Sequence, residues 1–511
     1  MRKIYKFLLL LIGLSITGCS DLVEEPVSLL SPEGIFQTTD DIQTAVNGAY
    51  THAINEEIWG RKLSVALMLR SDMVNLQSTQ TRRVEMNMHT ITDDNEMVYD
   101  PWRRIWLGIA AANTAIEGAK LVDVDESTKN PVIAQAYFIR AFYYFHLVRL
   151  FGDVPYIDYV IDSSNSQATS EITSTSEADV YTKIISDLKY AEEWLPNTVA
   201  TRALPSKAAA KSYLALVYLT MAGTDGTANF QLAYDKAKEV INNKSIYGVD
   251  LDPDFQTLFN ADLIDGSVEP IFALDYNNVE ADNNAYDQIS PMTGIRGDDD
   301  DQGWSVAVPT MAVYDSFDKD DYRTRVSFQT EATIGGVTVD YSEFSISGHA
   351  HAANQPYIAK YSRYPGEYAR GNKRATSHNY SMLRYAEVLL IAAEAGVEIG
   401  AGDALSLLNE VRGRARNGGN STNGGYVEQT IAASTIPADL TSITVEDVLE
   451  ERRIELAFEG KRWYDIKRRR LGDEVFGASG YEGDKPDWNS AVDYDTPLPQ
   501  DELAVLPNIT N

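Results

Sequence analysis

Residues 136–155 read AYFIRAFYYFHLVRLFGDVP, and large apolar side chains in this run recur at three- and four-residue steps. The recurring positions start just before the run and are Ala134, Tyr137, Phe138, Ala141, Phe145 and Val148. This spacing places them on one face of an α-helix. Pro131 suits the first turn of a helix, and Gly152 and Pro155 are typical of its end. The pattern therefore predicts a helix over residues 131–151 with one buried face.

Similar helical patterns lie on both sides of this stretch. Asp40 and Asp41 are suited to cap a helix that continues through Tyr50, because an Asp side chain accepts hydrogen bonds from free backbone N–H groups. The other predicted helices are 102–120, 176–195, 206–222, 230–242, 382–399, 402–416 and 445–470. Helices joined by short turns, with Ala alternating with Tyr and Leu, are typical of tetratricopeptide-like hairpins, and a general helical bundle is the alternative. We predict a mainly α fold with a helical hairpin scaffold.

Between the helical segments the composition changes. Residues 250–375 are rich in Asp, Asn, Gly, Tyr and Pro and have little helical period. Loops this long inside a compact protein are usually functional or have structure of their own. We therefore predict a single domain over residues 41–511 with a large loop-rich insertion. Its parts are a helical scaffold at about 41–249 and 376–470, the insertion at about 250–375, and a C-terminal loop region at 471–511.

The N-terminus has the pattern of a cleaved secretion signal. Basic residues are followed by a short apolar run at 7–14, and small residues then precede Cys19, the only cysteine. Such a run is too short to span a bilayer well. The position of Cys19 resembles a bacterial lipobox, whose cysteine becomes the first mature residue and carries lipid; an ordinary signal peptide with an incidental cysteine is the alternative. We predict a lipoprotein signal peptide at 1–18 and a lipidated, membrane-anchored tether at 19–40.

The sequence is strongly acidic, with 44 Lys and Arg residues against 75 Asp and Glu, a formal net charge of −31. Such a surface repels phosphate groups, which argues against nucleic acid and anionic lipid head groups as ligands. A secreted chain without disulfides needs a large hydrophobic core, and about 490 residues suffice to build one.

Few sequence features indicate catalysis or a cofactor. The sequence has no Gly-x-Ser-x-Gly elbow, no P-loop and no dinucleotide-binding glycine fingerprint. Asp298 and Asp300 belong to an acidic run that offers oxygen ligands to calcium, but the run lacks the spacing of an EF-hand loop, and a solvated acidic loop is the preferred interpretation. We expect no enzyme activity and no cofactor, with a structural calcium ion as the open alternative.

Four segments together match one known family. Besides residues 136–155 they are LRYAEVLLIAAEA at 383–395, ERRIELAFEGKRWYDIKR at 451–468 and PLPQDEL at 497–503. In this order, behind a lipobox, they resemble the SusD/RagB family of outer-membrane nutrient-binding lipoproteins of Bacteroidetes. The charges within 451–468 are able to pair within or between helices. We interpret that segment as structural, so it identifies the family without marking a binding site.

The resemblance implies a non-catalytic glycan-binding lipoprotein. A protein of this kind captures oligosaccharides at the cell surface and delivers them to a SusC-like TonB-dependent outer-membrane transporter, on which it acts as a lid. Acidic residues after Cys19 look like the signal that exports some lipoproteins to the outer cell surface. The alternatives are a peptide-binding RagB-type lipoprotein with the same lid role and a surface glycosidase, which would need two carboxyl groups about 5–10 Å apart.

A sugar presents C–H patches on its ring faces and hydroxyl groups around its edge. A binding site therefore needs aromatic side chains for the faces and planar Asp, Asn, Gln or Arg groups for the hydroxyls. The family places such residues in loops of one exposed face. The candidates here are Asp72, Asn75, Arg82, Asn95, Trp102, Tyr276, Asn284, Tyr286 and Trp304. Trp304 stands out because it follows an acidic, Gly-bounded loop, whereas Trp102 opens a helix and is equally well explained as a core residue.

Overall fold

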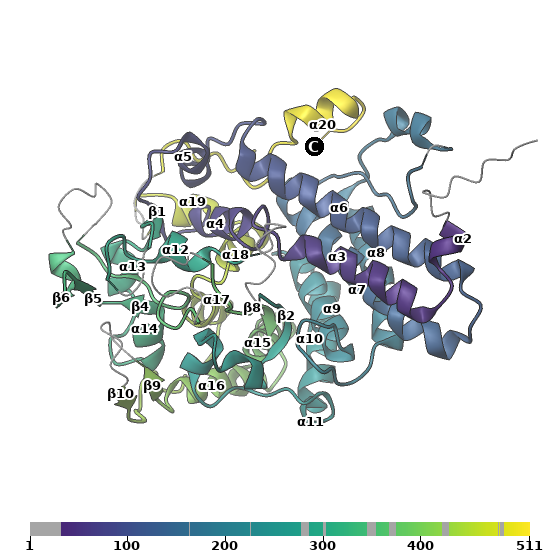
Figure 1. Cartoon of the computed structure of the whole chain (residues 1–511). Helices are drawn as coiled ribbons and strands as arrows, with labels where there is room; N and C mark the ends of the chain where they lie inside the picture. The colour runs from purple at the N-terminus through teal and green to yellow at the C-terminus, as the bar shows by residue number, and fades with distance from the viewer. Residues whose placement is uncertain are drawn as a thin grey trace, which may run out of the picture.

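The computed structural model shows how the chain is arranged in space (Figure 1). It describes residues 32–162, 164–224, 226–276, 286–299, 303–344, 354–366, 375–421, 429–478, 480 and 485–510. The predicted signal peptide, Cys19 and most of the predicted tether lie outside these residues, as do Asn284 and Asp300. No helix in the described part of the chain combines the length and the apolar character that crossing a bilayer requires.

Long helices build one half of the molecule. They are α3 (Thr39–Ala53), α6 (Glu96–Gly118), α7 (Glu126–Phe151), α8 (Glu177–Trp194), α9 (Lys207–Ala222), α10 (Thr227–Asn242), α15 (Tyr385–Ile399) and α16 (Ala404–Ala415). Consecutive helices pack against each other from α6 through α10, and α15 packs on α10 although the loop-rich region separates them in sequence (Figure 1). This succession of packed helices confirms the predicted mainly α fold.

Helix α7 lies at the centre of this half. From Phe138 to Phe151 every side chain is buried, because α3, α6 and α8 pack around the helix and the ring of Phe272 lies 4.9 Å from that of Phe138. Helix α6 approaches closely at Gly108, where a Cβ atom would lie 2.3 Å from the ring of Tyr143. A helix enclosed on all sides is typical of the core of a large protein. The prediction of one buried face was therefore too narrow.

The helix starts depend on capping side chains. Ser176 caps α8, and its Oγ atom accepts a hydrogen bond from the N–H of Asp179 at 3.2 Å. At α3 the cap is Thr38 rather than the predicted Asp40, and Asp41 accepts a bond from the N–H of Thr38 at 2.7 Å. This reciprocal arrangement is a capping box, in which the acidic residue stands three positions after the cap.

The predicted helix 445–470 is two helices in the structure, α17 (Val445–Glu455) and α18 (Arg462–Arg469). Between them Phe458 and Gly460 have positive φ angles of 66° and 69°. Because a left-handed backbone conformation cannot continue a right-handed helix, the helix ends there. The break turns α18 away from α17 and lets both pack on the core.

The predicted helix 382–399 begins three residues late, at Tyr385. Its first part belongs to strand β8 (Tyr380–Arg384), which pairs antiparallel with β2 (Pro270–Leu274). Pairing with a strand distant in sequence overrides the local helical preference, as tertiary context commonly does.

Short elements joined by loops build the other half. The further strand pairs of the described residues are β1 (Asn75–Leu76) with β3 (Ala307–Val308), β4 (Phe328–Gln329) with β7 (Tyr357–Ile358), β5 (Glu331–Ile334) with β6 (Val337–Asp340), and β9 (Gly419–Ser421) with β10 (Gln429–Ile431). The short helices are α4 (Lys62–Leu69), α5 (Thr81–Met88), α12 (Ile289–Thr293), α13 (Met311–Asp315), α14 (Tyr322–Ser327), α19 (Gly472–Val475) and α20 (Gln500–Val505). Two more short helices, α2 (Pro32–Ile35) and α11 (Lys244–Tyr247), lie beside the long helices (Figure 1). Turns of 3₁₀ helix are η1 (Ala119–Leu121), η2 (Ser166–Glu171), η3 (Phe255–Phe259), η4 (Ile264–Gly266) and η6 (Tyr341–Glu343).

A network of buried ions joins the two halves. At its centre is Glu455, the last residue of α17, whose side chain has no exposed surface. Its carboxylate accepts hydrogen bonds from Arg384 at 2.6 Å and Arg323 at 2.9 Å, and it also pairs with Arg414. Burial alone would raise the pKa of Glu455, but the three guanidinium groups outweigh it and hold the pKa well below its usual range. The carboxylate is therefore ionised and fully paired.

Neighbouring carboxylates of the same segment extend this network. Glu451 pairs with Arg323 at 2.5 Å, and Glu459 pairs with Arg384 at 2.9 Å and Lys360 at 2.8 Å. Taking ions out of water is costly unless each is paired and hydrogen-bonded, as these are. The charges of residues 451–468 thus have the structural role expected for them.

Candidate ligand-binding site

Residues far apart in the sequence form one surface around α5, α12 and the β1–β3 pair. The labels of α5, β1 and α12 lie near one another in Figure 1. We call it the α5–α12 surface. Its members are Arg61, Asn75, Arg82, Arg83, Tyr286, Arg296 and Trp304. Four of them, Asn75, Arg82, Tyr286 and Trp304, are among the ligand residues predicted from the sequence, and all four keep exposed surface.

The chain between α3 and α4 holds the start of this surface in place. The N–H of Gln288 donates to the carbonyl oxygen of Gly60 at 2.7 Å, and Arg61 donates to Oε1 of Gln288 at 2.8 Å. Gly60 permits the approach, because a Cβ atom there would lie 2.4 Å from the carbonyl oxygen of Tyr286. Tyr286 is half-buried, and its hydroxyl donates to Glu56 at 3.2 Å. The phenol ring is thereby fixed at the edge of the surface.

Trp304 is positioned by a chain reversal. A Cβ atom on Gly303 would lie 2.0 Å from the carbonyl carbon of Gly294, so only glycine allows the two backbones to cross here. The N–H of Trp304 then donates to the carbonyl oxygen of Pro291 at 2.5 Å. The indole packs on the core on one side and stays half-buried. The strand that follows pairs with β1, which brings Asn75 opposite Val308.

Helix α5 adds two arginines to the surface. Arg82 pairs with Glu96 at 2.5 Å. Arg83 is half-buried, and its side chain lies 3.5 Å from the Ser78 hydroxyl and 3.7 Å from the sulfur of Met292. Burial, together with the neighbouring charges of Arg82 and Arg61, lowers the pKa of Arg83 to about 10. The three guanidinium groups are thus close enough to repel one another.

Four other predicted ligand residues are buried, which corrects the expectation that they face a ligand. Asp72 has an exposed fraction of 0%, and its carboxylate accepts two hydrogen bonds from Arg462 at 2.8 and 2.7 Å. Trp102, also 0% exposed, lies with its ring 4.8 Å from that of Phe151. Tyr276 is 2% exposed. The residue types that bind sugars also build cores, so composition alone did not separate them.

Asn95 is the fourth buried candidate, with an exposed fraction of 4%. It caps α6 by accepting a hydrogen bond from the N–H of Met97 at 2.8 Å. Its amide donates to the carbonyl oxygen of Arg82 at 2.9 Å and to Glu85 at 2.6 Å. Asn95 therefore holds α5 against α6 and supports the α5–α12 surface from below.

The acidic run offers little to a metal where the structure describes it. Asp298 is buried, and its carboxylate accepts hydrogen bonds from the Gln329 amide at 3.0 Å and the N–H of Thr333 at 3.3 Å. Over the described ranges no three His, Cys, Asp or Glu side chains are grouped so that they could hold a metal ion. Asp300 lies outside those ranges.

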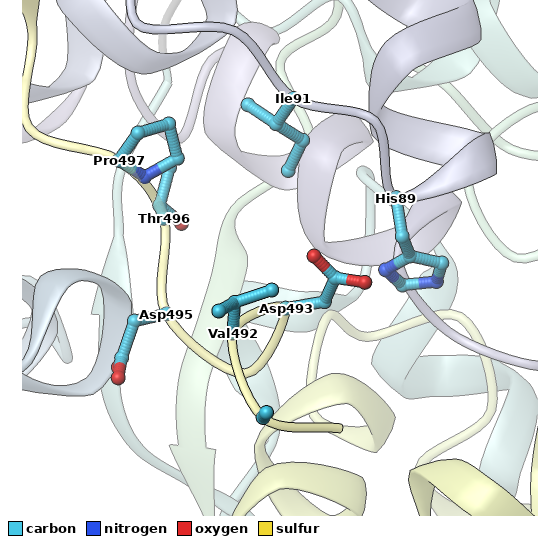
Figure 2. A pocket seen from close by; sticks show the side chains of 8 residues that line it. His89, Ile91, Val492, Asp493, Asp495, Thr496 and Pro497 are labelled. Carbon is cyan, nitrogen blue, oxygen red and sulfur yellow. The ribbon is translucent and has the colours of Figure 1, made fainter. Parts of the chain in front are cut away.

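A pocket of about 410 Å³ lies beyond the other end of α5 (Figure 2). Its described lining is His89, Ile91, Ala491, Val492, Asp493, Asp495, Thr496 and Pro497. The His89 ring lies 4.4 Å from Phe476 and 5.0 Å from Trp488, and burial lowers its pKa well below the usual value. The pocket contains no predicted ligand residue and no Trp, Tyr or Phe among its described lining, so it lacks the flat faces that sugar rings require.

Asp287, directly after Tyr286, is buried and carries a perturbed carboxyl group. It accepts hydrogen bonds from the N–H of Ile289 at 2.8 Å and from the Thr376 hydroxyl, and burial raises its pKa to about 6 from an ordinary 3.8. Between about pH 4 and pH 6, the carboxyl group of Asp287 is therefore protonated in the folded state but ionised in the unfolded state. Stability is greatest below the unfolded pKa and falls as pH rises through the folded pKa.

We expect Asp287→Asn to remove this loss of stability at rising pH. Between about pH 4 and pH 8, the difference in unfolding free energy between variant and parent should shift by about 3 kcal/mol in favour of the variant, since one pKa unit corresponds to about 1.4 kcal/mol. Urea unfolding at both pH values measures the shift. Asp262→Asn, at an exposed position, is the matched control and should show none. A difference that does not change with pH would contradict the assignment.

Two family descriptions match the sequence. Residues 24–219 match a SusD-like family described as "Starch-binding associating with outer membrane", and residues 335–511 match the SusD family. A curated relative, SusD-like protein P2 of Formosa agariphila, is 46% identical over 518 residues, which cover 100% of this chain and 99% of the relative.

Solved structures share the fold. A SusD homolog from Bacteroides thetaiotaomicron has a TM-score of 0.78 at 20% identity and covers 94% of this chain and 97% of its own. Surface glycan-binding protein A from Bacteroides thetaiotaomicron, solved in complex with laminarihexaose, has a TM-score of 0.72 at 20% identity and covers 92% of this chain and 98% of its own. These likenesses confirm the predicted SusD-like architecture. Together with the 46% identity over its whole length, they show that the chain belongs to the SusD/RagB family.

Proposed function

We propose that this protein is a non-catalytic surface glycan-binding lipoprotein that captures oligosaccharides on the α5–α12 surface. The observation that carries the proposal is the half-buried Trp304, which the close approach of Gly303 to Gly294 fixes in place and to whose carbonyl oxygen Arg296 donates at 3.3 Å. Two structural neighbours support it: one is a laminarin-binding SusD-like protein, and the other was solved with laminarihexaose.

The chemistry of this surface suits binding without bond cleavage. The Trp304 and Tyr286 rings supply apolar faces for sugar rings, while arginine and amide groups donate to hydroxyls at the ring edges. The nearby carboxylate of Glu56 is already paired with Arg61 at 2.6 Å and accepts the Tyr286 hydroxyl. It therefore stabilises the surface, and we assign no catalytic group to it.

Calorimetry against plant, algal, host and microbial glycans tests the proposal. We expect Trp304→Ala to weaken binding of the glycan found by about 5- to 150-fold, because losing a stacking platform costs about 1–3 kcal/mol by analogy with base stacking. Trp194→Ala, a half-buried tryptophan on α8, is the matched control and should leave affinity unchanged.

The same measurement separates the alternatives. Binding to peptides but to no glycan would replace the proposal with a RagB-type peptide-binding function. Release of reducing ends from a bound glycan by the pure protein would instead indicate a glycosidase. An intact Trp304→Ala variant with unchanged affinity for the glycan would move the site away from the α5–α12 surface.

The lipid anchor and the transporter are the remaining parts of the proposal. Lipid on Cys19 tethers the protein to the outer membrane, and the captured oligosaccharide passes to a SusC-like TonB-dependent transporter on which the protein acts as a lid. The support is the family membership and the lipobox at Cys19. Purification of the full-length chain from outer membranes tests this part: absence of any barrel partner would contradict the lid role.

A further inference from the structure

The α5–α12 surface contains several arginines although the protein as a whole is acidic. The chain has a net charge of −31, yet four arginines, Arg61, Arg82, Arg83 and Arg296, belong to this surface. Two of them are neutralised locally, Arg61 by Glu56 at 2.6 Å and Arg82 by Glu96 at 2.5 Å. Arg83 and Arg296 form no ion pair with a carboxylate of the described residues.

Arg83 and Arg296 both lie at the chain reversal between Gly294 and Gly303 that positions Trp304. Arg83 lies 3.7 Å from the sulfur of Met292, and the N–H of Val306 donates to the carbonyl oxygen of that same Met292 at 3.0 Å. Arg296 donates to the carbonyl oxygen of Trp304 at 3.3 Å. The two guanidinium groups are thus fixed against the element that carries the predicted stacking platform.

A half-buried arginine without an anion beside it raises the free energy of the folded protein. Arg83 is half-buried, and among the described residues its side chain has a hydroxyl and a thioether as hydrogen-bond partners, so its charge has lost part of its hydration without forming an ion pair there. The planar guanidinium group matches the geometry of carboxylates and of sulfate-type oxygens, to which it donates two parallel hydrogen bonds. A neutral sugar would leave this charge uncompensated.

Resting on the function proposed above, we propose that the ligand is an anionic saccharide, whose carboxylate or sulfate groups bind Arg83 and Arg296 while a neighbouring ring stacks on Trp304. The long-range field of the protein opposes such a ligand, but at physiological salt it is screened within about 8–10 Å. Selection for negative charge therefore depends on these two local arginines and not on the net charge of the chain.

Charge-matched pairs of ligands test this inference. Calorimetry compares oligogalacturonates with their methyl esters and sulfated galactan oligosaccharides with their desulfated forms. We expect the anionic member of at least one pair to bind at least about tenfold more tightly than its neutral counterpart, as charge-assisted hydrogen bonds do. The pair that shows the preference tells whether the anion is a carboxylate or a sulfate.

Variants then assign the preference to residues. Arg83→Gln and Arg296→Gln should each reduce the preference by about tenfold or abolish it, whereas Arg83→Lys, which keeps the charge, should keep part of it. Arg202→Gln is the matched control, because Arg202 is also half-buried and donates to the carbonyl oxygen of Gly248 at 2.7 Å, far along the chain from α5. Melting temperatures verify that each variant is folded.

The outcomes distinguish this inference from the function on which it rests. Neutral glycans that bind as tightly as anionic ones, or a preference that survives both Gln substitutions, would overturn the inference and leave the glycan-binding function intact. Absence of binding to every member of both sets and to the wider glycan panel would overturn both.

Discussion

Replacing Glu455 by Gln should lower the unfolding free energy by about 3–5 kcal/mol, the cost of leaving buried charge uncompensated. The substitution keeps the shape of the side chain and removes one negative charge from among three guanidinium groups, those of Arg323, Arg384 and Arg414. None of the three can reach water, since their side chains are at most 2% exposed. Chemical unfolding and the melting temperature measure the loss.

The control for this substitution is an exposed ion pair on another helix. Glu117 of α6 pairs with Lys120 at 2.6 Å, and the two side chains are 38% and 65% exposed. Glu117→Gln should therefore cost less than about 1 kcal/mol, as exposed ion pairs do. Equal losses of unfolding free energy for the two variants would show that the buried network contributes no more to stability than an exposed ion pair does.

Replacing Trp102 by Ala should also cost about 3–5 kcal/mol of unfolding free energy, because the cavity left by a fully buried aromatic ring is filled only in part. The indole ring lies 4.8 Å from Phe151 of α7 and 5.7 Å from Trp106, so its loss opens a gap between α6 and α7. Thermal and urea unfolding measure the effect.

Trp102→Ala is informative because it is the opposite of Trp304→Ala. The first should destabilise the fold and leave the glycan affinity of the folded protein unchanged, and the second should do the reverse. A folded Trp102→Ala variant that binds glycan more weakly, with little loss of stability, would return Trp102 to the binding site and contradict its buried placement.

The predictability of the fold differed between local and distant contacts. The end of helix α7 was predicted correctly at Phe151, because apolar spacing and the terminating glycine are local features, whereas its start lies at Glu126, before the predicted Pro131. The network around Glu455 could not be predicted in detail, since Arg323 and Arg384 lie 132 and 71 residues away. The helix break at Phe458 was not predicted for a related reason: Phe458 has a left-handed backbone conformation although it is not a glycine.

The candidate site was predicted in part. Trp304 was predicted because a large aromatic side chain after an acidic, Gly-bounded loop has no obvious helix face to pack on, and the structure leaves it half-buried. Trp102 and Tyr276 were included wrongly as exposed residues, since only the position of their neighbours decides burial. Arg83 and Arg296 were missed. The one signal for Arg83 was its place next to Arg82, and no helix had been predicted over 81–88 to show that Arg83 faces α12.

The buried network also sets an order of assembly. Glu455 and Glu459 stand in the last fifth of the chain, while the cations that need them, Arg323, Lys360 and Arg384, emerge earlier during synthesis and export. Until the C-terminal segment is present, these cations lack their carboxylate partners and must remain hydrated. We therefore expect the loop-rich half to close only after this segment arrives, and a chain cut before α17 to lack the carboxylates that pair with these cations.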